Sequence, residues 1–191
     1  MNTRSFHPAH FLPLRRTLAL GAVLFALAES GIAQTASTAK PNLLKNPAFE
    51  EGEVGWQFNA WGKKGAATVD TTEKREGKNS IRIENTAGDD SFFKQVVTVK
   101  PQTRYRLTGY IKTKGVVAKG SGAVLSLEGG YEKTESLEGN NGWKKMEFEF
   151  DSAGNAEVKV GPRLGHHHSM AMGVAWFDDL KMVEIGPSRK R

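Results

Sequence analysis

Apolar and polar residues alternate in short segments between residues 55 and 185, and no segment shows the 3.6-residue period of a helix. Alternation with a period of two is typical of strands that place one face in a core. Gly, Asn or Pro closes almost every segment, and the 21 glycines of the chain suit tight turns. The pattern predicts strands over residues 55–61, 66–70, 79–85, 92–100, 104–113, 122–131, 143–151, 156–164 and 173–185. Nine strands at this spacing predict an all-β sandwich.

The same alternation predicts which side chains face the core. The expected inward residues are Tyr105, Leu107, Gly109 and Ile111, then Ala123, Leu125 and Leu127, and finally Met146, Phe148 and Phe150. Arg106, Tyr110 and Glu128 are then expected on outward faces, and they share one surface if their strands adjoin. That surface is either a binding face or an ordinary solvated face.

Two adjacent aspartates, Asp178 and Asp179, interrupt the last predicted strand. Neighbouring strand residues point to opposite faces, and a buried carboxylate without a partner is costly. Asp178 has the parity of the apolar residues Leu180 and Met182, so we expect Asp178 inside and Asp179 in solvent. The inward aspartate must then be paired with something.

The N-terminal segment has the pattern of a secretory signal. Arg4, Arg15 and Arg16 precede a short apolar run over residues 17–28, and Gly31-Ile32-Ala33 supplies small residues for cleavage. We therefore predict a signal peptide over residues 1–33, a polar linker over 34–41, one domain over 42–186 and a basic tail over 187–191. The predicted location is secreted or periplasmic, with no membrane attachment after cleavage.

Charge and cysteine content exclude several classes of function. Without the signal the formal net charge falls from +6 to +4, and acids are interleaved with the bases. The chain lacks the basic stripe with aromatic residues expected of a nucleic-acid-binding protein, so no nucleic acid is expected. It has no cysteine, so its stability must come from the core, with help from a bound ion as one possibility. We expect a monomer.

Four segments occur in a distinctive order: NLLKNPAFEEGEVGW at 42–56, REGKNSIRI at 75–83, FKQVVTVKPQTRYRLTGYIKT at 93–113 and AWFDDLKM at 175–182. Together they resemble the carbohydrate-binding modules of families four, nine and twenty-two, which share a galactose-binding-domain-like jelly roll. The resemblance extends over nearly all of residues 42–185. It is more specific for the fold than for the ligand.

The resemblance implies a structural calcium ion where the first and last strands meet. The matching residues are Glu50 and Asp178, with the backbone carbonyl of Lys78 and its neighbours in the 77–79 turn. Carboxylate and carbonyl oxygens are the ligands that calcium prefers. The alternative is that Asp178 accepts hydrogen bonds from backbone amides and binds no metal.

The resemblance also implies a poly- or oligosaccharide ligand, bound by aromatic rings that stack on sugar faces and by polar side chains that bond hydroxyls. The aromatic candidates are Trp61, Tyr110, Tyr131 and Trp143, and the polar candidates are Arg106, Glu128 and Arg163. Trp56 and Trp176 lie inside the fold signatures and are expected in the core. The site is expected either on a concave strand face or at the loop edge. The sequence leaves both open.

Catalysis is not expected. A glycosidase needs two carboxylates that flank the bond, and only Glu147 and Glu149 place two acids on one strand face in a comparable way. We expect His166, His167 and His168 to form a loop beside the glycan face rather than a metal site. Two functions therefore remain: an exported non-catalytic carbohydrate-binding module, and a structural or adhesive jelly roll that binds protein or no small ligand.

Overall fold

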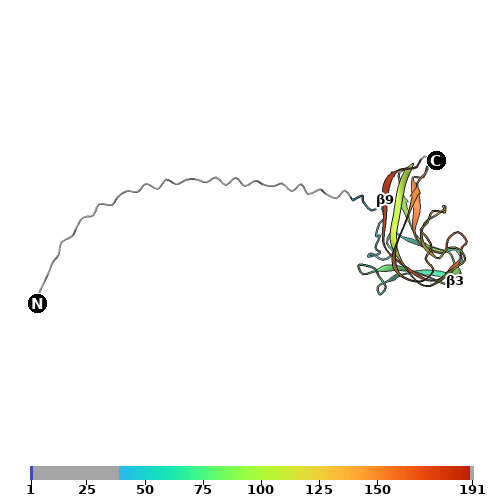
Figure 1. The fold of residues 1–191 in the computed structure, drawn as a ribbon, viewed down its shortest axis with the longest axis horizontal. Coiled ribbons are helices and arrows are strands. Elements are labelled where there is room, and N and C mark those ends of the chain that lie inside the picture. Colours follow the sequence, from blue (N-terminus) through green and yellow to red (C-terminus); the bar gives the residue numbers. More distant parts are fainter. Residues whose placement is uncertain (2–38, 190–191) are drawn as a thin grey trace. The chain divides into compact units, whose positions relative to one another are not determined.

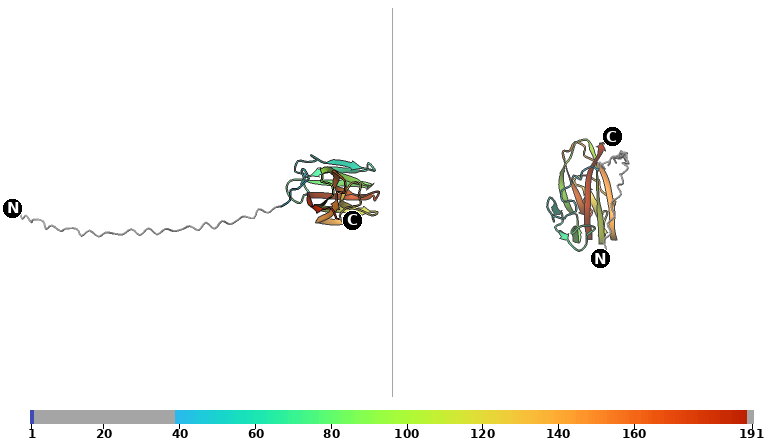
Figure 2. Two further views of the ribbon diagram at one scale, coloured as in Figure 1. Left: turned by 90° about the horizontal axis from the view of Figure 1, so that it is seen from above. Right: turned by 90° about the vertical axis from the view of Figure 1, so that its left-hand side faces the viewer.

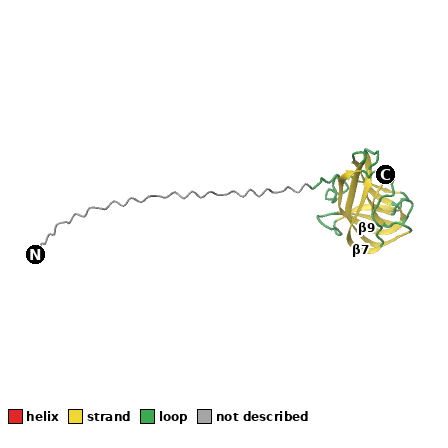
Figure 3. Ribbon diagram, turned by 45° about the horizontal axis from the view of Figure 1, so that its top comes forward, coloured by secondary structure: helices red, strands yellow, loops and turns green. Residues whose placement is uncertain are grey.

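The computed structural model describes residue 1 and residues 39–189. The predicted signal peptide, most of the linker and residues 190–191 lie outside the described residues. Strands and loops make up the described domain, as Figure 3 shows. No helix long and apolar enough to cross a membrane occurs in residues 39–189.

Nine strands form two antiparallel sheets (Figures 1 and 2). The four-stranded sheet has the order β1-β4-β8-β6, and the five-stranded sheet has the order β2-β3-β9-β5-β7. The strands are β1 (Gln57–Ala60), β2 (Gly65–Asp70), β3 (Ser80–Asp89), β4 (Ser91–Thr98), β5 (Thr103–Ala118), β6 (Ala123–Leu127), β7 (Gly139–Asp151), β8 (Glu157–Leu164) and β9 (Ala171–Pro187). Each predicted strand overlaps one of them, so the prediction of an all-β sandwich is confirmed.

The core lies between the two sheets and follows the predicted alternation. Tyr105, Leu107, Gly109 and Ile111 of β5 are buried, while the alternate residues Arg106, Thr108 and Tyr110 are only partly covered. On β7, Phe148 and Phe150 are buried, and they pair in register with Leu107 and Tyr105. Burial of one face of each sheet is the main source of stability in a sandwich of this kind.

An aromatic cluster ties the N-terminal segment to the core. Phe49, Trp56 and Phe93 pack with ring centroids 5.2–6.0 Å apart, and all three side chains are buried. The indole Nε1 of Trp56 donates a hydrogen bond to the backbone oxygen of Asn46, at 3.1 Å. Trp56 is thus a core residue, as predicted. The N-P-x-F segment forms the turn that brings Phe49 into this cluster.

Asp178 is buried, but it does not lie on the core-facing side of β9, where its parity with Leu180 and Met182 placed it. Asp179 has a φ of 50° and adds an extra residue to β9, and the β5–β9 register shifts at this point. Asp178 therefore pairs with the outward-facing Tyr110 and not with the core side of β5. The 71–79 loop covers it, and Asp179 forms an ion pair with Arg75 at 3.1 Å. Trp176 is likewise buried, with its Nε1 bonded to Asp70.

The connection from β3 to β4 joins the two sheets through a buried asparagine. The Asn85 side-chain amide approaches the backbone oxygens of Asp89, Leu164 and Ala171 at 3.0–3.2 Å. Its Oδ1 accepts a hydrogen bond from the Ser91 hydroxyl at 2.7 Å. These partners belong to β3, β4, β8 and β9, so one side chain satisfies backbone groups of both sheets. We call residues 85–91 the junction segment.

Gly65 shows how tightly the junction segment is packed. A Cβ placed on Gly65 would lie 2.0 Å from the Ser91 hydroxyl oxygen and 2.4 Å from Asn85 Oδ1. Any side chain at position 65 would therefore displace the Ser91–Asn85 hydrogen bond. The glycine allows β2 to start directly against the junction.

We predict that Asn85→Ala lowers the free energy of unfolding by about 3 kcal/mol, because it leaves several buried carbonyl groups without a donor. Urea denaturation followed by tryptophan fluorescence measures the change. Asn155→Ala is the matched control, because Asn155 is exposed, and its loss should stay within about 0.5 kcal/mol. Equal losses in the two variants would contradict the role of Asn85.

Candidate functional site

A cavity of about 400 Å³ lies at the outer surface of the four-stranded sheet. We call it the face cavity. Its walls come from the loop after β1, from Asp90 between β3 and β4, from β8, from the turn after β6 and from the loop between β8 and β9. The side chains that matter for its chemistry are Trp61, Asp90, Glu128, Arg163, His167 and His168.

Arg163 forms the rigid centre of the face cavity. Its side chain is 3% exposed, and its Nε and Nη2 donate to the two oxygens of Asp90, at 2.6 Å each. The guanidinium carbon lies 4.9 Å from the ring centroid of Trp61 and 5.0 Å from that of Phe92. A paired, stacked guanidinium of this kind is fixed in one orientation. Its Nη1 has no hydrogen-bond partner among the described residues.

The loop that carries Trp61 is fixed by the acid next to Asp90. The buried Asp89 accepts hydrogen bonds from the backbone amides of Gly62 and Lys64, at 2.6 Å each. The amide of Trp61 donates to the backbone oxygen of Asp90 at 3.1 Å. Trp61 is 49% exposed, so one part of the indole packs on Arg163 while the rest faces solvent. The ring is a pre-positioned stacking surface.

Sequence reasoning missed Asp89 and Asp90, although a signal was present. They form a second pair of adjacent aspartates beside apolar strand residues, as Asp178 and Asp179 do. The same cost argument applies to both pairs, since a buried carboxylate needs donors. Here the donors are the amides of the Trp61 loop and the guanidinium of Arg163.

Glu128 lies at the rim of the face cavity, between two lysines. Its carboxylate forms ion pairs with Lys94 and with Lys159, the latter at 2.8 Å. Burial opposes ionisation of Glu128, but the hydrogen bonds from Lys159 and Lys94 outweigh it and lower the pKa of this carboxyl. Glu128 is therefore a fixed, ionised hydrogen-bond acceptor.

The loop between β8 and β9, which carries His166, His167 and His168, forms another wall of the face cavity. His167 Nε2 lies 2.6 Å from the backbone oxygen of Gly130, and the ring of His167 lies 5.2 Å from that of Tyr131. Tyr131 is 85% exposed. His166 is buried, and burial, followed by the positive charge of Arg163, lowers the pKa of its ring to about 4. Through His167, the loop between β8 and β9 therefore contacts Gly130 and Tyr131, which follow β6.

The remaining sugar-binding candidates lie on the other sheet. Arg106 and Tyr110 belong to β5 and Trp143 to β7. Arg106 pairs with Glu149 at 2.6 Å, and the guanidinium of Arg75 lies 3.8 Å above the ring of Tyr110. Glu128 follows β6 of the four-stranded sheet. The condition for a common surface of Arg106, Tyr110 and Glu128 is therefore not met, because β5 and β6 belong to different sheets.

The acids expected at a calcium site accept hydrogen bonds from amides. Glu50 Oε1 accepts from the amides of Lys78 and Asn79, at 2.8 and 3.1 Å, and these bonds lower the pKa of Glu50. Asp178 accepts from the amides of Arg75, Glu76 and Asp179, at 2.7–3.3 Å. In residues 39–189 no group of three or more His, Cys, Asp or Glu residues is placed to hold a metal ion. For Asp178, this is the arrangement of the metal-free alternative.

A family model described as "Carbohydrate binding domain" matches residues 41–160 of the chain. Among curated proteins, the chain is 26% identical over 161 residues to the tRNA(Glu)-specific nuclease WapA of Bacillus subtilis subsp. natto. That alignment covers 76% of this chain but only 7% of the nuclease. The chain thus spans less than a tenth of the length of this curated relative.

Two solved structures illustrate the likeness in fold. The first is TmCBM61 in complex with β-1,4-galactotriose, with a TM-score of 0.55 and 21% identity over 76% of this chain and 99% of that one. The second is the CBM22-1 xylan-binding domain of Paenibacillus barcinonensis Xyn10C, with a TM-score of 0.50 and 15% identity over 80% of this chain and all of that one. The predicted jelly-roll sandwich is confirmed by these neighbours.

We predict that Asp90→Ala lowers the free energy of unfolding by about 3 to 5 kcal/mol, because it leaves the buried guanidinium of Arg163 unpaired. The double variant Asp90→Ala/Arg163→Met should recover most of this loss, since it removes both charges. Urea denaturation of both variants measures the effect. A double variant as unstable as the single one would show that the ion pair is not the cause.

Proposed function

The chain belongs to the carbohydrate-binding domain family, and from this premise we propose that it is an exported, non-catalytic protein that binds a poly- or oligosaccharide in the face cavity. Trp61 would stack on a sugar ring, while Glu128 and the backbone around it would bond hydroxyl groups. Trp61, Glu128 and Arg163 were all candidates from the sequence, and they line this one cavity.

The observation that carries the proposal is the support beneath Trp61. Arg163, Asp89 and Asp90 hold the indole and its loop, yet Trp61 stays 49% exposed. An exposed indole contributes less to the stability of the fold than a buried one does, so its fixed position above a buried ion pair is better explained by ligand binding. A fixed ring binds a flat apolar sugar face without a further loss of side-chain entropy.

The carboxylates near the cavity favour binding over hydrolysis. A glycosidase needs one carboxyl group with a raised pKa as the general acid. Glu128 instead has a lowered pKa, and Asp90 is held by Arg163. Glu147 and Glu149 formed the other candidate pair, and there the hydrogen bond from Arg106 lowers the pKa of Glu149. We therefore propose no catalytic residue.

Affinity electrophoresis through gels that contain soluble polysaccharides, including β-1,4-galactan and xylan, tests the function. We predict that at least one polysaccharide retards the wild type and that Trp61→Ala weakens this binding about tenfold or more, because the stacking surface is lost. Trp61→Tyr should restore most of the binding. Trp143→Ala, which removes a half-buried ring on the other sheet, is the matched control.

Retardation by no polysaccharide would reject glycan binding and favour the structural or adhesive jelly roll. Equal weakening by Trp61→Ala and Trp143→Ala would instead move the site away from the face cavity. Thermal melting of each variant shows whether a loss of binding follows from a loss of folding.

Structural calcium at Glu50, Lys78 and Asp178 stays a proposal that derives from the family resemblance. If calcium binds, EGTA lowers the melting temperature of the wild type, and added calcium restores it, because an ion bound only by the folded state stabilises that state. Glu50→Gln should abolish this response. An identical melting curve with EGTA and with calcium would contradict the proposal and leave the amide bonds as the only partners of these acids.

A further inference from the structure

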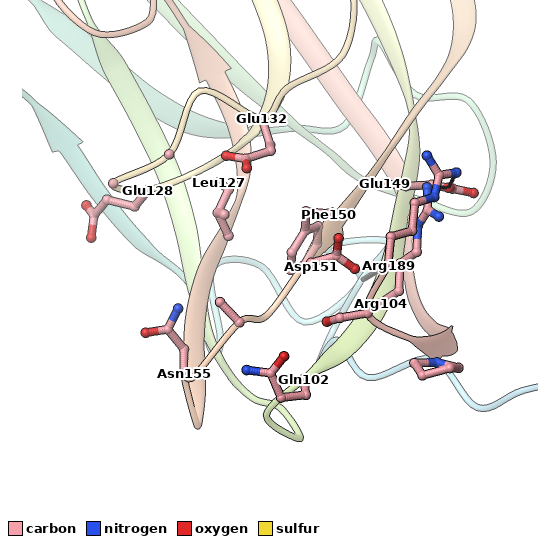
Figure 4. Close-up of a pocket in the computed structure, with 15 residues that line it drawn as sticks. Gln102, Arg104, Leu127, Glu128, Glu132, Glu149, Phe150, Asp151, Asn155 and Arg189 are labelled. Atoms are coloured by element: carbon pink, nitrogen blue, oxygen red, sulfur yellow. Dashed lines mark hydrogen bonds and ion pairs between the residues drawn. The ribbon is translucent and has the colours of Figure 1, made fainter. Parts of the chain in front are cut away.

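A second and larger cavity, of about 810 Å³, lies where β6 and β7 form the edges of their two sheets. We call it the edge cavity. Figure 4 shows Arg104, Arg189 and Glu149 on one side of it and Glu128 on the other, with Asp151 between them. Gln102 and Asn155 line its lower part. None of the candidate aromatic residues lines this cavity, and Glu128 is the one polar candidate among its lining residues.

One oxygen in the edge cavity is buried without a partner. Asp151 Oδ1 is shielded from solvent, and it has no hydrogen-bond donor in the part of the chain that the structure describes. The neighbouring Glu149 differs, because Arg104 and Arg106 both donate to it. A buried acceptor without a donor costs free energy, and a ligand hydroxyl recovers that cost once the surrounding side chains move to admit it.

The edge cavity and the face cavity meet at the turn after β6. Glu128 and Gly129 line both of them. Lys94 and Lys159 hold Glu128 in place, so its carboxylate stands at a fixed point between the two cavities. Gly129 has a φ of 79°, and a Cβ placed on it would have no heavy atom within 4 Å. The space above Gly129 is therefore open, so a ligand can pass over this turn from one cavity to the other.

We propose that the edge cavity is a second glycan-binding site, which holds the continuation of the chain that is bound beside Trp61. The ligand is then an internal stretch of an extended polysaccharide, which crosses the Glu128–Gly129 turn, and not a chain end or a short sugar. This inference rests on the proposed function, because it extends the same ligand beyond the face cavity.

The side chains of the edge cavity suit a ligand rich in hydroxyl groups. Gln102 and Asn155 provide amides, Glu132 and Asp151 provide carboxylate acceptors, and Arg104 and Arg189 provide donors. Each sugar hydroxyl both donates and accepts, so it can use donors and acceptors placed side by side. The apolar wall of Leu127 lies between the polar groups and offers contact to the C–H face of a pyranose.

Gly129→Asn tests the crossing. Asparagine tolerates a positive φ, and the new side chain would stand in the free space between the two cavities. Isothermal titration is carried out with a trisaccharide and a hexasaccharide of the polysaccharide that retards the wild type. We expect the wild type to bind the hexasaccharide more tightly than the trisaccharide. Gly129→Asn should weaken hexasaccharide binding about tenfold and trisaccharide binding by a much smaller factor, although Gly129 also lines the face cavity.

Gly139→Asn is the matched control. Gly139 has a φ of 72° and equally open surroundings, but it starts β7 and lines neither cavity. Asp151→Ala should also weaken hexasaccharide binding alone. Amide chemical shifts should confirm the location, with changes at Gln102 and Asn155 caused by the hexasaccharide but not by the trisaccharide.

Equal affinity of the wild type for the two lengths would overturn the inference, as would shifts confined to the face cavity. If Trp61→Ala abolishes binding while Gly129→Asn and Asp151→Ala leave hexasaccharide binding intact, the proposed function stands and this inference fails. If no polysaccharide binds the wild type, both fail together.

Discussion

The need to satisfy buried polar groups where the two sheets meet governs much of this structure. Between Asn85 and Ser91 the chain passes from the five-stranded to the four-stranded sheet, and regular pairing cannot continue through the crossing. Asn85 supplies the missing donors for carbonyl groups of three segments. In the same segment, Asp89 accepts hydrogen bonds from the loop of Trp61, and Asp90 accepts hydrogen bonds from Arg163. Stability and the candidate site therefore depend on one short segment.

Local patterning was enough to predict the strands and their buried faces, because burial of one face imposes a period of two. It failed at Asp178, where the extra residue Asp179 changes the phase of β9. A bulge leaves little trace in composition, since an aspartate with positive φ reads like any other polar residue. Parity with Leu180 and Met182 predicted a buried Asp178, and Asp178 is buried, but on the opposite face of β9 and beneath the 71–79 loop.

Sheet order explains which candidate site residues come together. Trp61, Glu128 and Arg163 lie far apart in the sequence, yet they belong to the loops and strands of one sheet. Arg106 and Tyr110 have equally suitable chemistry but belong to β5 of the other sheet. Adjacency of strands results from long-range pairing, which alternation does not encode. Side-chain type therefore identified the candidate residues, and the order of strands in the sheets determined which of them line one cavity.

The two pairs of adjacent aspartates show how one motif acquires different roles. In each pair one carboxylate is bonded by backbone amides of a neighbouring loop: Asp89 by the loop of Trp61 and Asp178 by the loop of Arg75. The second member of each pair binds an arginine. The Asp90–Arg163 pair is buried beneath an exposed indole, whereas the Asp179–Arg75 pair is partly exposed above a tyrosine. A buried ion pair holds its arginine more rigidly than an exposed one, because solvent screening is weaker there. The difference in burial, not the motif itself, lets the first pair support the proposed binding surface, whereas the second pair holds a loop in place.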